Sequence, residues 1–73
     1  MVRHLWANFN ADQMAILNLS FEIACQELKV DPADNESRDR IAQAILKLAN
    51  GGEFDPDRLI NYAISRFSYR NER

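Results

Sequence analysis

Few residues in this sequence are of the types that carry out chemistry. His4 is the only histidine and Cys25 the only cysteine, and no serine, cysteine or aspartate stands next to His4. Cys25 falls among apolar residues at helical spacing, where a cysteine acts as a small buried hydrophobe rather than as a redox thiol. Because nucleophilic catalysis needs a paired base and a metal site needs several ligands, we predict a protein that is not an enzyme and holds neither a cofactor nor a metal.

An acidic stretch supplies oxygen ligands of the kind that calcium prefers, namely Asp31, Asp34, Glu36 and Asp39. An EF-hand loop also needs a central glycine and a closing glutamate at fixed positions. Pro32 interrupts the acidic stretch, and the stretch contains no glycine. We therefore expect these acids to cap the following helix and to interact with the positive end of its dipole.

The residues best suited to contact a partner lie near the C-terminus. Arg58, Tyr62, Arg66 and Tyr69 recur at helical spacing, so they fall on one side of a helix. Tyrosine and arginine are enriched at protein interfaces and among interface hot spots. The pattern indicates a docking face; the alternative is that the tyrosines cover the edge of the core while the arginines are solvated.

A nucleic-acid interpretation uses the same region, because two helices and their turn can imitate a helix-turn-helix. The turn at 50–55 is longer than that motif normally has, and Asp55 and Asp57 would face phosphates. The formal net charge is −2, whereas nucleic-acid-binding domains are usually basic. A DNA-binding regulator that uses Arg58, Arg66 and Arg70 is therefore the alternative rather than the leading hypothesis.

Helices must position these side chains, and the longest is predicted at about 10–30. Asn10 and Gln13 have the spacing of a capping box, and Asp12 suits the positive end of the helix dipole. Apolar residues then recur at helical steps along one side, which we expect to form the core: Met14, Leu17, Phe21, Ala24, Cys25 and Leu28.

The opposite side of this helix is also apolar, with a second stripe formed by Ala15, Ile16, Leu19 and Ile23. In a chain of 73 residues, two further helices cover one stripe. The second stripe then needs the N-terminal arm at 1–9, a second subunit or another protein. We favour a homodimer whose interface contains Trp6, Ile16, Leu19 and Ile23, because a side chain as large and apolar as Trp6 is not expected to remain in water.

Two further helices are predicted at about 35–50 and 55–68, with 69–73 as a frayed tail. Asp34 or Asn35 caps the first, and Asp55 caps the second with Pro56 in the first helical position. Gly51 is expected in the left-handed conformation that commonly ends a helix. The predicted core stripes are Ile41, Ala44, Ile45 and Leu48 in the first helix, and Leu59, Ile60, Ala63, Ile64 and Phe67 in the second.

Arg38 falls within the apolar arc of the 35–50 helix. We interpret it as a side chain that lies along the helix end and extends its charged group into solvent. The alternative is an ion pair, either with a second chain or with a carboxylate of the preceding helix such as Glu22 or Glu27.

The segment from Arg38 to Phe67 combines an Ile-Ala helix, a Gly-Glu turn, an Asp-Pro cap and a closing helix. The residues that form this pattern are Arg40-Ile41-Ala42, Ile45-Leu46, Gly52-Glu53, Asp55-Pro56 and Arg58-Leu59. In this pattern the chain resembles small uncharacterised bacterial all-helical proteins. The resemblance covers less than half of the chain and implies no activity.

Composition bounds the class of protein. With 47% apolar and 27% charged residues, the sequence is ordinary for one globular domain, here 1–73. No apolar run is long enough to span a bilayer, the N-terminus lacks the features of a signal peptide, and a single free thiol suits the cytoplasm.

We therefore predict an all-α fold, a small cytoplasmic bundle of three main helices with a short N-terminal arm, which is dimeric. Its predicted function is protein–protein interaction, as a regulatory or adaptor module that associates with itself or with another protein. The alternatives are the DNA-binding regulator and a small-ligand-binding helical module, in which Asn18, Glu22 and His4 would converge on a pocket.

Overall fold

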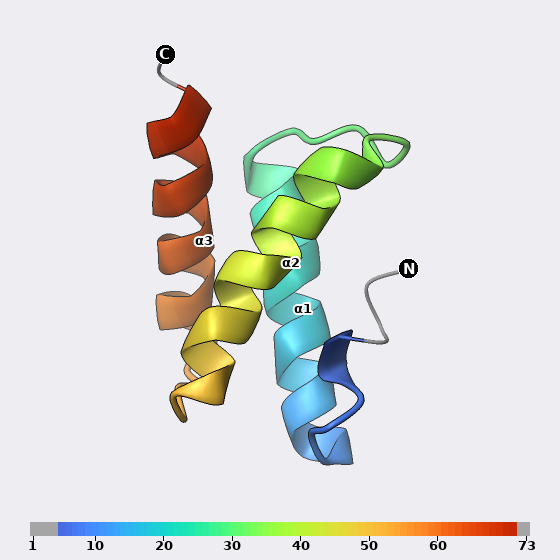
Figure 1. Cartoon of the computed structure of the whole chain (residues 1–73), viewed down its shortest axis with the longest axis vertical. Coiled ribbons are helices and arrows are strands. Elements are labelled where there is room, and N and C mark those ends of the chain that lie inside the picture. The colour runs from blue at the N-terminus through green and yellow to red at the C-terminus, as the bar shows by residue number, and fades with distance from the viewer. Residues whose placement is uncertain (1–4, 72–73) are drawn as a thin grey trace.

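The computed structural model describes the backbone of residues 5–71 and the side chains of residues 5–67. That part of the chain is all-helical, with α1 at Ala11–Glu27, α2 at Asn35–Asn50 and α3 at Pro56–Asn71 and no strand. Helices α1 and α3 run in the same direction, and α2 runs in the opposite direction and crosses in front of α1 (Figure 1). Each helix contacts the other two. The predicted all-α class is confirmed, and the predicted dimer stays a prediction.

Side-chain caps start the helices where the sequence predicts. The Asn10 Oδ1 atom accepts a hydrogen bond from the Gln13 amide at 2.8 Å, and the Gln13 Oε1 atom accepts from the Asn10 amide at 3.1 Å. This reciprocal capping box satisfies two amides that the first turn of α1 leaves without a carbonyl partner. Asp34 caps α2 by accepting from the Ser37 amide at 3.1 Å. Asp55 accepts from the amide of Asp57 at 3.1 Å at the start of α3.

Helix α1 ends earlier than the expected residue 30, at Glu27. Lys29 adopts a left-handed backbone conformation with φ 55°, and its amide donates to the Gln26 carbonyl at 3.1 Å. The Val30 amide donates to the Cys25 carbonyl at 3.0 Å, which completes a Schellman motif. A lysine in this conformation is disfavoured by contact between its Cβ atom and the backbone, so sequence alone gives no signal for this helix end.

Helix α2 ends in the same motif, but the glycine that adopts the left-handed conformation is not the predicted one. Gly51 has φ −88° and remains close to helical, whereas Gly52 has φ 95°. The Glu53 amide donates to the Leu48 carbonyl at 3.0 Å across this turn. Helix α3 extends to Asn71, beyond the expected residue 68.

The core lies where the three helices meet, and its buried hydrophobic residues are Trp6, Leu17, Phe21, Ala24, Cys25, Ile41, Ala42, Ile45, Ala49, Leu59 and Ala63. The predicted core side of α1 is confirmed. Helix α2 is rotated relative to the prediction, because Ala42 and Ala49 are buried while Ala44 and Leu48 are only half-buried. This rotation turns Ala44 towards a surface groove.

The N-terminal arm contributes to this core. Trp6 is 1% exposed, and its ring meets the Phe21 ring edge-on at a centroid distance of 6.5 Å. Phe9 meets Phe54 edge-on at 5.7 Å, which joins the start of α1 to the turn that precedes α3. The Trp6 Nε1 atom has no hydrogen-bond acceptor among the residues that the structure describes.

The side chain of Arg38 on α2 lies against α1. Its conformation differs from the favoured interpretation, in which the charged group extends into solvent. Its guanidinium carbon is 4.9 Å from the centroid of the Phe21 ring, and its Nη2 atom is 3.8 Å from the Glu22 Oε2 atom. The side chain is 24% exposed. Instead of extending freely into solvent, Arg38 forms the alternative ion pair with α1 and adds a cation–π contact.

Candidate functional site

A groove of about 590 Å³ runs between α2 and α3 on the outside of the bundle. It is lined by residues of both helices: Asp39, Arg40, Gln43, Ala44, Leu46, Lys47, Asn50, Tyr62, Ala63, Arg66 and Phe67. Positions three and four apart on a helix face the same way. For this reason Arg40, Ala44 and Lys47 line one wall, and Tyr62 and Arg66 line the other.

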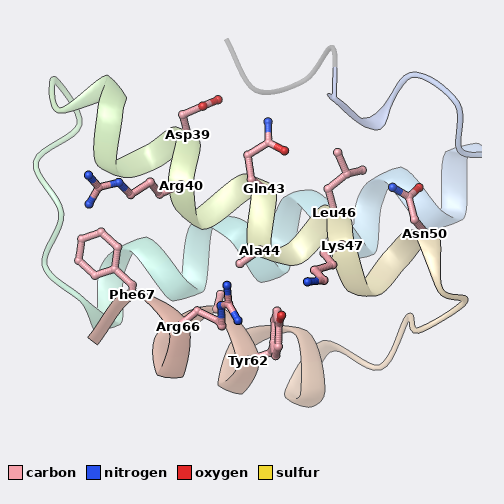
Figure 2. Close-up of a pocket in the computed structure, with 11 residues that line it drawn as sticks. Asp39, Arg40, Gln43, Ala44, Leu46, Lys47, Asn50, Tyr62, Arg66 and Phe67 are labelled. Atoms are coloured by element: carbon pink, nitrogen blue, oxygen red, sulfur yellow. The ribbon is translucent and has the colours of Figure 1, made fainter. Parts of the chain in front are cut away.

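The side chains of the groove have distinct directions (Figure 2). Tyr62 and Arg66 rise from α3 towards α2, and Lys47 extends from α2 towards them, whereas Asp39 and Gln43 point away from α3. The space between the helices is thus bounded by basic and aromatic groups, while the acidic residue of the lining lies on its outer side.

Three cations line the groove, and they differ in how far the chain already neutralises them. Arg40 approaches Glu36 at 3.5 Å. The Arg66 guanidinium carbon lies 5.7 Å from the centroid of the Tyr62 ring. Within the described part of the chain, neither Lys47 nor Arg66 forms a salt bridge. Their charges remain available to an anionic group from another molecule.

The structure divides the docking face that the sequence predicts on α3. Tyr62 and Arg66 meet in the groove. Arg58 lies outside it and is 73% exposed, with its Nε atom 3.9 Å from Asp55 and 4.0 Å from Glu53. Tyr69 belongs to α3, but its side chain lies outside the described residues.

The α2 wall of the groove is the part that sequence reasoning missed. Arg40, Gln43, Lys47 and Asn50 occupy one polar side of α2 at helical spacing, which is typical of a solvated face. Their spacing was a visible signal, but only the placement of α3 beside them turns this side into a wall. Phe67, which was predicted to face the core, is half-buried and lines the groove.

The predicted self-association residues lie in different environments. Leu19 is 52% exposed, and Ile16 and Ile23 are half-buried. Ile16 packs against the core. Trp6 is inside the core against Phe21, so it adds no exposed area to this side of α1.

Among the described residues, the remaining candidates form no second site. Cys25 is 4% exposed, and burial raises the pKa of its thiol above the ordinary value. Hydrogen bonds from the Ser37 hydroxyl and amide lower the pKa of Asp34, which accords with its role as a helix cap. His4 lies outside the described residues. Within those residues, no group of three or more side chains could hold a metal ion.

Two further findings bear on the class of protein. No described helix combines the length and the apolar character needed to cross a membrane. Comparison of the chain with protein-family models, curated proteins and solved structures gives no match. The functional argument therefore depends on the side chains of this chain.

Proposed function

We propose that this protein is a small, non-enzymatic binding module that docks another protein in the groove between α2 and α3. The observation that carries the proposal is the combination of Tyr62, Phe67 and Arg66 on one wall with Lys47 on the other, where Lys47 has no salt-bridge partner among the described residues. Aromatic residues and arginine are enriched at protein interfaces. We propose a regulatory or adaptor role, because protein docking is the activity that this groove supports best.

Enzymatic chemistry has little support among the described side chains. A nucleophile must reach its substrate, and Cys25 is buried with a raised thiol pKa. Because this cysteine is a free thiol, we also propose a reducing, cytoplasmic location.

The DNA-binding alternative has weaker support than protein binding. Arg58, one of the three arginines on which it depends, already lies within 4.0 Å of Glu53 and close to Asp55. A phosphate would have to compete with two carboxylates there. The volume of the groove is also within the usual range of pockets that bind small ligands. The test must therefore distinguish binding of a small ligand from binding of a protein.

The test uses peptides selected from a displayed random library against the full chain. Backbone amide shifts would then be followed by NMR during titration with a selected peptide. We expect the largest changes at Gln43, Lys47, Tyr62 and Arg66, and loss of binding in Ala44→Phe, which fills the groove.

The matched control is Ala15→Phe, the same substitution at an exposed position of α1. Circular dichroism would verify that both variants fold, and Tyr62→Ala serves as a second groove variant that adds no bulk. The proposal would be contradicted if the peptide still bound to both groove variants. It would also be contradicted if a small organic anion displaced the peptide completely.

A second candidate function is self-association through the outer side of α1, as the sequence predicts. The observation in its favour is that Leu19, a large hydrophobic residue, is 52% exposed. Light scattering over a range of concentrations would give twice the mass of one chain for the wild type and the mass of one chain for Leu19→Asp. Gln26→Asp, which adds the same charge at another exposed position of α1, should keep the larger mass.

A further inference from the structure

We propose that the partner segment in the α2–α3 groove is an acidic amphipathic helix, an inference that rests on the proposed protein-binding function. Two helices that lie side by side form a natural seat for the apolar side of a third. The groove residues of α2 run from Asp39 to Asn50, which corresponds to about 16 Å along a helix axis. That length matches about three turns of a docked helix.

The inner part of the groove suits a helix because its central residues are small. Ala44 on α2 and Ala63 on α3 project only a methyl group each, and Ala63 is fully buried. Large apolar side chains of a partner can therefore enter between the helices, where Phe67 and Tyr62 offer aromatic surface. Such anchors would repeat along the partner at helical spacing.

The charge of the groove indicates which residues should flank the apolar anchors of the partner. The groove lining contains Arg40, Lys47 and Arg66 against one acid, Asp39, although the whole chain carries a formal charge of −2. This local excess of positive charge on an acidic protein favours carboxylates that flank the apolar anchors. Lys47 and Arg66 stand on opposite walls, so acids on both flanks of the docked helix would meet a cation.

A nucleic acid also carries negative charge, but the groove fits it less well. Its lining includes the half-buried Ala44 and Phe67, which offer apolar contact and no hydrogen bond to phosphate. Asp55 and Asp57 stand at the N-terminus of α3, beyond the groove, where a continuous polyanion would be repelled. Apolar anchors between carboxylates describe a protein helix better than a phosphate backbone.

The test compares three fluorescein-labelled peptides of about 18 residues, long enough to form a helix, which differ in charge alone. All have leucines on one side, and the flanking positions carry glutamate, glutamine or lysine. By fluorescence anisotropy with the full chain, we expect the glutamate peptide to bind about tenfold more tightly than the glutamine peptide, and the lysine peptide not to bind.

Charge reversal at one groove position should remove this preference. Lys47→Glu breaks no salt bridge among the described residues, and it leaves Arg40 and Arg66 against Asp39 and the new glutamate, so the glutamate and lysine peptides should bind about equally. Lys29→Glu is the matched control, because it changes the net charge equally at an exposed position outside the groove. It should keep the wild-type order of the three peptides.

The outcomes separate this inference from the proposed function. If the glutamine peptide binds as tightly as the glutamate peptide and Ala44→Phe abolishes both, the groove binds helices but the acidic partner is wrong. If none of the peptides is affected by Ala44→Phe or Tyr62→Ala, the groove is not the docking site. If single-stranded DNA competes fully with the glutamate peptide, the groove recognises negative charge alone and the helical partner is wrong.

Discussion

Leu17 and Leu19 stand two positions apart on α1, and the protein uses them in opposite ways. Leu17 is fully buried in the core, whereas Leu19 is 52% exposed. The sequence gives both sides of this helix an apolar stripe at helical spacing. The difference shows that periodicity identifies the sides of a helix but does not say which side the rest of the chain covers.

Alanine substitution at these two positions should give the largest difference in stability. Leu17→Ala removes a fully buried side chain and should lower the free energy of unfolding by about 2–5 kcal/mol. Leu19→Ala should change it by less than about 0.5 kcal/mol. Urea denaturation followed by circular dichroism measures both values.

A chain of this size rarely has more than about 3–5 kcal/mol of stability from its core, so Leu17→Ala should leave a large unfolded fraction without urea. A large loss of stability in Leu19→Ala instead, with Leu17→Ala unaffected, would mean that the two sides of α1 have been exchanged. A similar loss in both variants would mean that both sides are covered in solution.

A smaller effect is expected at the border of the buried side, where Arg38 contacts both Phe21 and Glu22. Arg38→Met keeps an apolar stem but removes the ion pair and the cation–π contact, and should lower the free energy of unfolding by about 1 kcal/mol. A double-mutant cycle with Glu22→Gln isolates the share of that loss that belongs to the ion pair.

Arg40→Met is the control, because Arg40 pairs with Glu36 on the surface of a single helix at 3.5 Å. Such pairs contribute only about 0.3–0.5 kcal/mol. If Arg38→Met costs no more than this control, the contact with the Phe21 ring adds nothing to stability.

The smallest effect concerns thiol chemistry on the two sides of α1. Burial raises the pKa of the Cys25 thiol, so a thiol reagent should react with native Cys25 at least about tenfold more slowly than with Leu19→Cys in a Cys25→Ala chain.

The raised pKa of Cys25 also makes stability depend on pH. As pH rises above about 8.5, the thiol of the unfolded chain loses its proton before that of the folded chain, so the free energy of unfolding should decline. Cys25→Ala should lose this decline, and equal reaction rates at the two positions would contradict the burial of Cys25.

The sequence predicted the helix starts because each depends on one side chain and its nearest amides. Asn10, Asp34 and Asp55 act where their types and spacing indicate. The helix ends were harder to predict, because the left-handed conformation fell on Lys29, which disfavours it, and on Gly52 rather than on Gly51. The unfavourable backbone conformation of Lys29 is offset because the turn gains two hydrogen bonds to carbonyl groups.

The candidate site was predicted only in part, for a geometric reason. Tyr62 and Arg66 lie on one helix, so their spacing alone places them together. The wall that faces them depends on the rotation of α2, which buries Ala42 and turns Ala44 outward. Rotation about a helix axis is fixed by the joint packing of all three helices, and no local signal in the sequence gives it.

The buried position of Trp6 also makes the protein its own optical reporter. Trp6 is the only tryptophan in the sequence, so its fluorescence comes from one place, the contact between the N-terminal arm and Phe21. Release of the arm would move the indole into water and shift its emission to longer wavelength. Arm docking can therefore be timed separately from loss of helix in the same sample, without a label.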